Sequence, residues 1–148
     1  MIYDVLAHIK KRPGMYLGKP SMNALGSYVH GFEHALALAH IPPQEDDEEF
    51  EHFKKWLAKE FHGANLGWNG QILFLVSGND PLWWRKDEKL EEQALERFFA
   101  LLEQYSSGLF QQAETRVSVV LEQVAQEVFL HNQKIFAEQK RTRSENKD

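Results

Sequence analysis

The stretch Arg12-Pro-Gly-Met-Tyr-Leu-Gly18 separates two runs of helical periodicity and sets the pattern of the chain. Before it, apolar residues at 2, 5, 6 and 9 recur at the spacing of one helical face. Pro13 disfavours helical backbone at the preceding residue and Gly14 suits a turn, so the first helix is predicted to end near Arg12. Three residues of this stretch are expected to pack back on the two helices that it joins: Met15, Tyr16 and Leu17.

Beyond this turn, apolar periodicity predicts further helices. Ser21 is a suitable N-cap for a second helix, which Pro42-Pro43 ends. A third helix opens in the acidic residues 45–49, where negative charge is favourable at a helix start, and Gly63 marks its end.

The second half of the chain predicts two long helices, at residues 90–105 and 117–136. The apolar residues 72–76 fit either a helix or a short buried strand, and helix is favoured because no second strand is evident for pairing. The sequence therefore predicts an all-α fold, a single domain of five or six helices over residues 1–138, with a possible short strand at 71–76. The polar segment 139–148 is expected to be a disordered tail.

The composition bounds the classes of function. The chain has 148 residues, is 43% hydrophobic and 26% charged, and contains no cysteine, which excludes disulfides and thiolate chemistry. A net charge of -5 argues against direct binding of nucleic acid, which needs a basic surface. The N-terminal residues do not resemble a signal peptide and no apolar run is long enough to span a bilayer, so a cytoplasmic location without membrane contact is expected.

Residues 9–18, followed by a helix, resemble the start of type II topoisomerase ATPase subunits. In that family the second helix carries a general-base glutamate and, four residues later, a magnesium-binding asparagine. The pattern places Gly26 and His30 at these positions. Glycine has no side chain to accept a proton and imidazole is a poor magnesium ligand, so ATPase activity is not expected.

A second motif, His30-Gly-Phe-Glu-His34, matches the H-x-x-E-H pattern of inverted zinc proteases. Both histidines and Glu33 share one polar helix face, which permits metal binding. Nothing in particular supports a third ligand such as Glu103 or Glu114, and short matches are frequent in a chain with seven histidines. A metal-dependent hydrolase is therefore kept as an alternative, while the leading prediction is a non-enzyme with no catalytic residues, cofactor or metal.

Two features suit a protein interface. One is an acidic run that would steer association with a basic partner, and the other is a tryptophan–arginine cluster of the kind that dominates binding energy. The predicted partner-binding residues are Glu45, Asp46, Asp47, Glu48, Glu49, Glu51, Trp83, Trp84 and Arg85.

A set of short motifs spread over residues 1–105 identifies a second resemblance. The motifs are Arg12-Pro-Gly-Met-Tyr-Leu-Gly18, Gly31-Phe32 in the helix that Ser21 opens, Phe53-Lys-Lys-Trp56, Gly67-Trp68 and Phe98-Phe-Ala-Leu-Leu102. Together they resemble small bacterial proteins encoded in toxin–immunity loci, including contact-dependent growth inhibition systems.

The resemblance implies an immunity protein that binds and neutralises a cognate toxin, with a basic nuclease as the favoured type of partner. An acidic domain without catalytic groups suits that role, because the active clefts of nucleases are electropositive. A self-associating helical adaptor that uses the tryptophan loop and the last helix is the other alternative.

Overall fold

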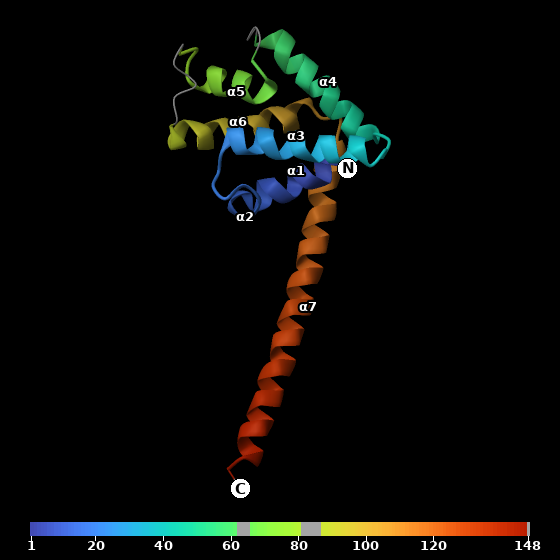
Figure 1. Ribbon diagram of the computed structural model, residues 1–148, viewed down its shortest axis with the longest axis vertical. Helices are drawn as coiled ribbons and strands as arrows, with labels where there is room; N and C mark the ends of the chain where they lie inside the picture. Colours follow the sequence, from blue (N-terminus) through green and yellow to red (C-terminus); the bar gives the residue numbers. More distant parts are fainter. Residues whose placement is uncertain (62–65, 81–86, 148) are drawn as a thin grey trace. The chain divides into compact units, whose positions relative to one another are not determined.

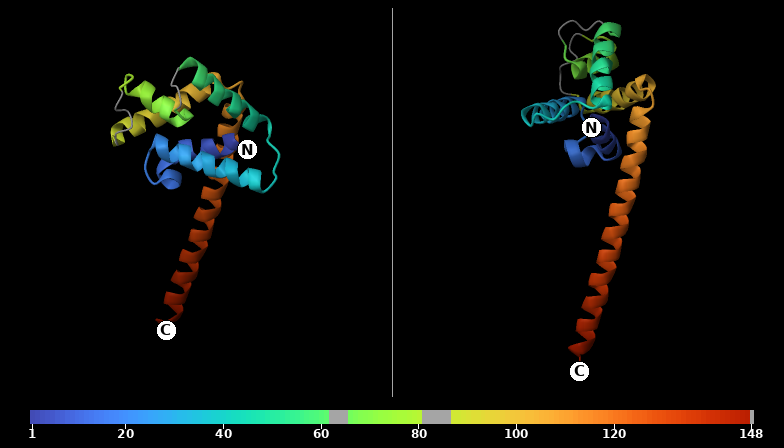
Figure 2. Two further views of the ribbon diagram at one scale, coloured as in Figure 1. Left: turned by 45° about the horizontal axis from the view of Figure 1, so that its top comes forward. Right: turned by 90° about the vertical axis from the view of Figure 1, so that its right-hand side faces the viewer.

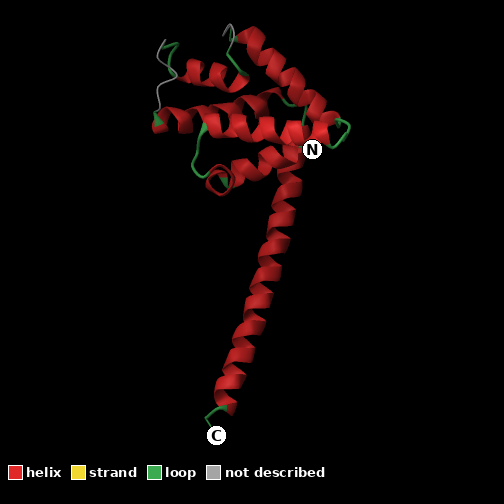
Figure 3. Ribbon diagram, in the orientation of Figure 1, coloured by secondary structure: helices red, strands yellow, loops and turns green. Residues whose placement is uncertain are grey.

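The computed structural model describes residues 1–61, 66–80 and 87–147. These residues form helices and no strand (Figure 3), which confirms the predicted all-α class. The chain divides into two compact units, Met1–Glu114 and Thr115–Asp148. The seven helices of the described part are α1 (Ile2–Lys11), α2 (Pro13–Leu17), α3 (Met22–Leu38), α4 (Glu45–Glu60), α5 (Trp68–Val76), α6 (Glu88–Tyr105) and α7 (Leu109–Glu145), labelled in Figure 1.

The observed number of helices exceeds the predicted five or six because the Arg-Pro-Gly turn forms a short helix of its own. Arg12 ends α1, and Pro13 then starts α2, where its missing N–H is no loss. Gly18 ends α2 with φ 77°, a backbone conformation that favours glycine. The short helix lies next to the start of α3 (Figure 2).

The turn packs back on both neighbouring helices through Tyr16, and Leu17 is half-buried. Its ring makes edge contacts with His8 of α1 at 6.1 Å and with Tyr28 of α3 at 6.5 Å between ring centres. The expectation for Met15 is wrong, because 70% of this residue is exposed. In a helix, residues three positions apart share a face, whereas adjacent residues point in different directions. Met15 and Tyr16 therefore cannot both face inward.

The predicted cap of α3 is confirmed, since the Ser21 hydroxyl accepts a hydrogen bond from the amide of Ala24 at 3.1 Å. Only the first half of the helix is buried, through Met22, Leu25 and Val29. The second half carries Phe32 and Leu36 at intermediate exposure rather than in the core. This partly open half of α3 forms one wall of the groove described below.

The core of the first unit is built from aromatic side chains. Phe98 of α6 is fully buried and contacts the rings of Phe50 and Phe53 from α4 and of Trp68 from α5. The Tyr3 ring packs edge-on against Phe110 with centres 5.5 Å apart. Aromatic rings bury large apolar areas, and edge-to-face pairs add to that stabilisation.

Helix α5 packs against both α3 and α6 (Figure 1), which resolves the uncertainty at residues 71–76 in favour of helix. The close approach of α3 and α5 depends on Gly26. A Cβ atom at this position would lie 2.8 Å from the Asn69 Cγ atom, so no larger side chain fits without displacement. The same geometry leaves no room for a glutamate where the ATPase pattern would need one.

The second unit consists of the continuation of α7. This helix starts earlier than the predicted residue 117 and extends to Glu145, so most of the segment 139–148 is helical although its polarity predicted a disordered tail. Lys, Arg, Glu, Gln and Ala are good helix formers, and adding residues to an existing helix is easier than nucleating one. Among the described residues no helix, α7 with its 37 residues included, is both long and apolar enough to cross a membrane.

Candidate protein-binding surface

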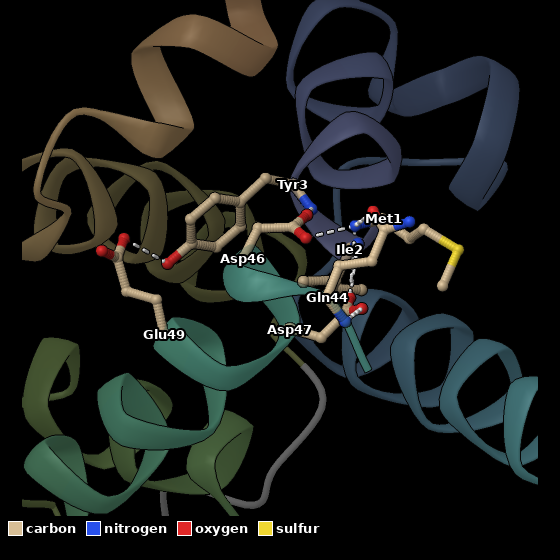
Figure 4. A network of polar contacts seen from close by, with 7 residues as sticks. All are labelled: Met1, Ile2, Tyr3, Gln44, Asp46, Asp47 and Glu49. Carbon is tan, nitrogen blue, oxygen red and sulfur yellow. Dashed lines mark hydrogen bonds and ion pairs between the residues drawn. The ribbon is translucent and has the colours of Figure 1, made fainter. Parts of the chain in front are cut away.

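The acidic run at the start of α4 is divided between the interior of the first unit and its surface. Asp47 faces inward, where one carboxylate oxygen accepts from the amide of Ile2 at 2.8 Å and the other from the amide of Gln44 at 2.7 Å (Figure 4). The first N–H groups of a helix have no partner within the helix. Asp47 therefore satisfies the starts of α1 and α4 together.

Asp46 and Glu49 also face α1. Asp46 accepts from the amide of Tyr3 at 2.9 Å and pairs with the amino group of Met1. Glu49 accepts from the Tyr3 hydroxyl at 2.9 Å (Figure 4) and from the backbone and hydroxyl of Ser107. These three carboxylates hold α4 against α1 and against the turn before α7, so their first role is structural.

The Tyr3–Glu49 hydrogen bond raises the pKa of the tyrosine and lowers the pKa of the glutamate. Burial raises the pKa of the Tyr3 hydroxyl, and the hydrogen bond to Glu49 raises it further. Partial burial alone would raise the pKa of Glu49, but the hydrogen bonds from Ser107, Ser106 and Tyr3 outweigh it and hold this pKa below its ordinary value. Tyr3 is thus a neutral donor and Glu49 a charged acceptor.

The remaining acidic residues of the run, Glu45, Glu48 and Glu51, are exposed. Glu51 pairs with Lys54, which also donates to Glu33 of α3 at 2.9 Å and lies 5.1 Å from the centre of the Phe50 ring. Burial alone would lower the pKa of Lys54, but the bonds to Glu51 and Glu33 raise it, so the ammonium stays charged. The interface prediction therefore divides into an inward set of three residues and an outward set of three.

A groove of about 480 Å³ lies between α3 and the start of α4. Its apolar lining includes Phe32, Leu36 and Ile41, and 44% of Ile41 is exposed. Carboxylates stand among the lining residues from both helices: Glu33, Asp47, Glu48 and Glu51. An apolar surface with acidic groups beside it suits a protein segment that carries both apolar and basic side chains. We refer to this feature as the acidic groove.

Only some of the residues that line the acidic groove could be predicted from the sequence. Phe32 and Leu36 lie on the apolar stripe of α3, which predicts a helix but not a groove. Ile41 lies between this helix and Pro42-Pro43 and has no periodic signal. His52, also in the lining, belongs to no motif. Helical periodicity shows which residues share a face, but it cannot show where along that face the neighbouring helix ends.

The H-x-x-E-H motif lies in the exposed second half of α3. His30 and His34 are exposed, and Glu33 is engaged with Lys54. Within residues 1–61, 66–80 and 87–147 no group of three histidine, aspartate or glutamate side chains is placed to hold a metal ion. Of the suggested third ligands, Glu103 and Glu114 both pair with Lys10.

The predicted tryptophan–arginine cluster, Trp83, Trp84 and Arg85, lies outside the described residues. Of the predicted interface residues, Asp47, Glu48 and Glu51 line the acidic groove. A scan of protein-family models, a search of curated proteins and a search of solved structures each found no match to this chain.

Proposed function

We propose that the first unit is an immunity-type inhibitor, a non-catalytic cytoplasmic bacterial domain that binds a cognate toxin and blocks it. The observation that carries the proposal is the acidic groove, with its apolar lining and the exposed carboxylates beside it. A toxin of the nuclease type presents a basic cleft for phosphates, and this cleft is the surface that an acidic inhibitor would cover.

The division of the acidic run supports this role. The inward carboxylates fix the helix starts, so the outward Glu45 and Glu48 are held on a rigid support. Charged groups on a rigid surface bind without the entropy loss of ordering a loop. The resemblance of residues 1–105 to proteins of toxin–immunity loci points to the same function, including the contact-dependent growth inhibition systems.

Co-expression with the product of the adjacent upstream gene tests the proposal. The expected result is that the chain restores growth of cells that produce this toxin candidate and that the two proteins co-purify. Failure of the chain both to restore growth and to co-purify with this protein would contradict the proposal.

Paired charge reversals locate the interface on the first unit. Glu48→Lys/Glu51→Lys, at two exposed glutamates that line the groove, is expected to weaken toxin binding at least about 10-fold and to reduce the association rate at low salt. The control, Glu92→Lys/Glu96→Lys, reverses two exposed glutamates of α6 away from the groove and is expected to leave binding within about 2-fold. Thermal unfolding of both variants verifies that they are folded. Equal losses of toxin binding in the two double variants would exclude the acidic groove as the interface.

A further inference from the structure

The proposed function leaves the exposed apolar face of α7 without a role. In the second unit Val124, Val128 and Ile135 expose 49%, 53% and 38% of their surface. A single helix has no core in which to bury such side chains, and its stability in a protein normally comes from packing of its apolar face.

The spacing along this face is that of a coiled coil. Leu121, Val124, Val128, His131 and Ile135 follow one another at intervals of 3, 4, 3 and 4 residues. This is the a and d pattern of the heptad repeat, which keeps a narrow seam directed at a partner helix. Other exposed apolar residues of α7, such as Val119 and Phe136, lie outside this seam because each residue turns the helix by about 100°.

We propose that this seam pairs two copies of the chain, with the α7 helices antiparallel in a two-stranded coiled coil. In the antiparallel register centred between Phe129 and Leu130, Val124 lies opposite Ile135 of the second copy, and Val128 lies opposite His131. The central four positions of the seam are therefore complementary to themselves, while Leu121 at each end lies opposite Glu138 of the second copy.

Charge complementarity argues for this occupant and this direction. Glu127 and Lys134 occupy the g positions that flank the seam. In the antiparallel pair Glu127 of each copy faces Lys134 of the other, which forms two opposite-charge pairs across the symmetry axis. A parallel pair would instead place Glu127 near Asn132 and Lys134 near Gln139, which are neutral.

Sedimentation of the full-length chain over a range of concentrations tests the association. The wild type is expected to form a dimer reversibly. Val124→Lys, in the seam, is expected to raise the dimer dissociation constant at least about 100-fold, because both copies lose a buried valine. Val119→Lys is the matched control, since Val119 is on the same helix, is also 49% exposed and lies outside the seam.

Charge exchange tests the direction of the helices. Glu127→Lys or Lys134→Glu alone is expected to weaken the dimer about 3- to 10-fold, and the double variant is expected to recover wild-type affinity. A parallel dimer would give no recovery, because these residues do not meet in it.

Spin labels measure the direction independently. The chain has no cysteine, so Lys140→Cys provides a single labelling site. Two labels are expected about 30 Å apart along an antiparallel coil, but side by side in a parallel one.

A wild type that stays monomeric at all concentrations would overturn the proposal and assign the seam to a different protein partner. Equal effects of Val124→Lys and Val119→Lys would also overturn it, because they would show association without a specific seam. None of these outcomes depends on toxin binding, so the dimer and the immunity function can be tested separately.

Discussion

The first unit and the second unit place similar side chains in opposite environments. In Met1–Glu114 the phenylalanines at 50, 53 and 98 are buried among other rings. In Thr115–Asp148 Phe129 and Phe136 expose 61% and 71% of their surface. A residue that stabilises the fold in one unit is thus available for binding in the other, and the difference comes from the neighbours that each helix has.

A similar contrast, between side chains that bond within the fold and side chains that face solvent, divides the acidic residues at the start of α4. Asp46, Asp47 and Glu49 are bonded to backbone and side-chain donors, whereas Glu45 and Glu48 are exposed. The hydrogen-bonded, half-buried carboxylates hold helices together, and the exposed ones are available to a partner. The predictions that follow compare matched positions across these divisions.

The largest expected effect comes from a comparison of two phenylalanine-to-alanine substitutions, one in each unit. Phe98→Ala removes a fully buried ring and is expected to destabilise the first unit by about 3–5 kcal/mol. Phe136→Ala is expected to change stability by less than about 0.5 kcal/mol, because its ring is exposed and lies outside the seam. Denaturant unfolding followed by near-ultraviolet circular dichroism measures the stability of both variants. Similar losses of stability would contradict the assignment of Phe98 to a buried environment and Phe136 to an exposed one.

Alanine substitutions of two glycines in α3 are expected to change stability by smaller amounts and in opposite directions. Gly26→Ala is expected to destabilise by about 1–3 kcal/mol, because its new Cβ would lie 2.8 Å from the Asn69 Cγ atom. Gly31→Ala meets no atom within 4 Å and is expected to stabilise the helix by up to about 1 kcal/mol.

The Asn69→Ala change tests the cause assigned to Gly26. Combined with Gly26→Ala, it is expected to recover part of the lost stability, since it removes the Asn69 Cγ and Nδ2 atoms that the new methyl group meets most closely. Thermal unfolding of the single and double variants measures the recovery, and a purely additive result would point to another cause.

The smallest expected effect is a change in pH dependence. Because the folded state lowers the pKa of Glu49, this residue stabilises the fold above its unfolded pKa, and that contribution is lost as pH falls through the lower folded pKa. Glu49→Gln is therefore expected to reduce stability at neutral pH and to flatten the loss of stability as pH falls below the ordinary pKa of glutamate, about 4.3.

Ser107→Ala should act in the same direction as Glu49→Gln but less strongly, since it removes one of the groups that bond to Glu49. Denaturant unfolding at several pH values provides the measurement. An unchanged slope in Glu49→Gln would show that the hydrogen bonds of Glu49 do not contribute to stability.

Much of the fold could be predicted from local sequence. The Ser21 cap and the helix at residues 90–105 both depend on signals within a few residues, and the structure confirms them. The short helix α2 was missed because a proline–glycine pair suits a turn as well as a first helical turn. The helical segment after residue 138 was missed because polarity argues against a core but not against a helix that already exists.

The candidate site could be predicted only in part, because its geometry depends on contacts between residues far apart in the sequence. The partners of Asp47 and Glu49 are Ile2 and Tyr3, more than forty residues away along the chain. Which carboxylates of the run turn inward depends on the packing of α1 against α4, and no local pattern encodes this. The acidic groove has the same origin, since its lining comes from residues 2–52.

Hydrogen–deuterium exchange of the full-length chain at low and high protein concentration tests the central contrast most directly. We expect amides of α6 at residues 94–102 to exchange slowly at both concentrations, because their helix is buried in the first unit. Amides at residues 121–135 are expected to exchange fast when the chain is dilute and slowly when it is concentrated, as the two seams pair. Slow exchange at residues 121–135 that does not change with concentration would contradict the account, as would a concentration dependence confined to α6.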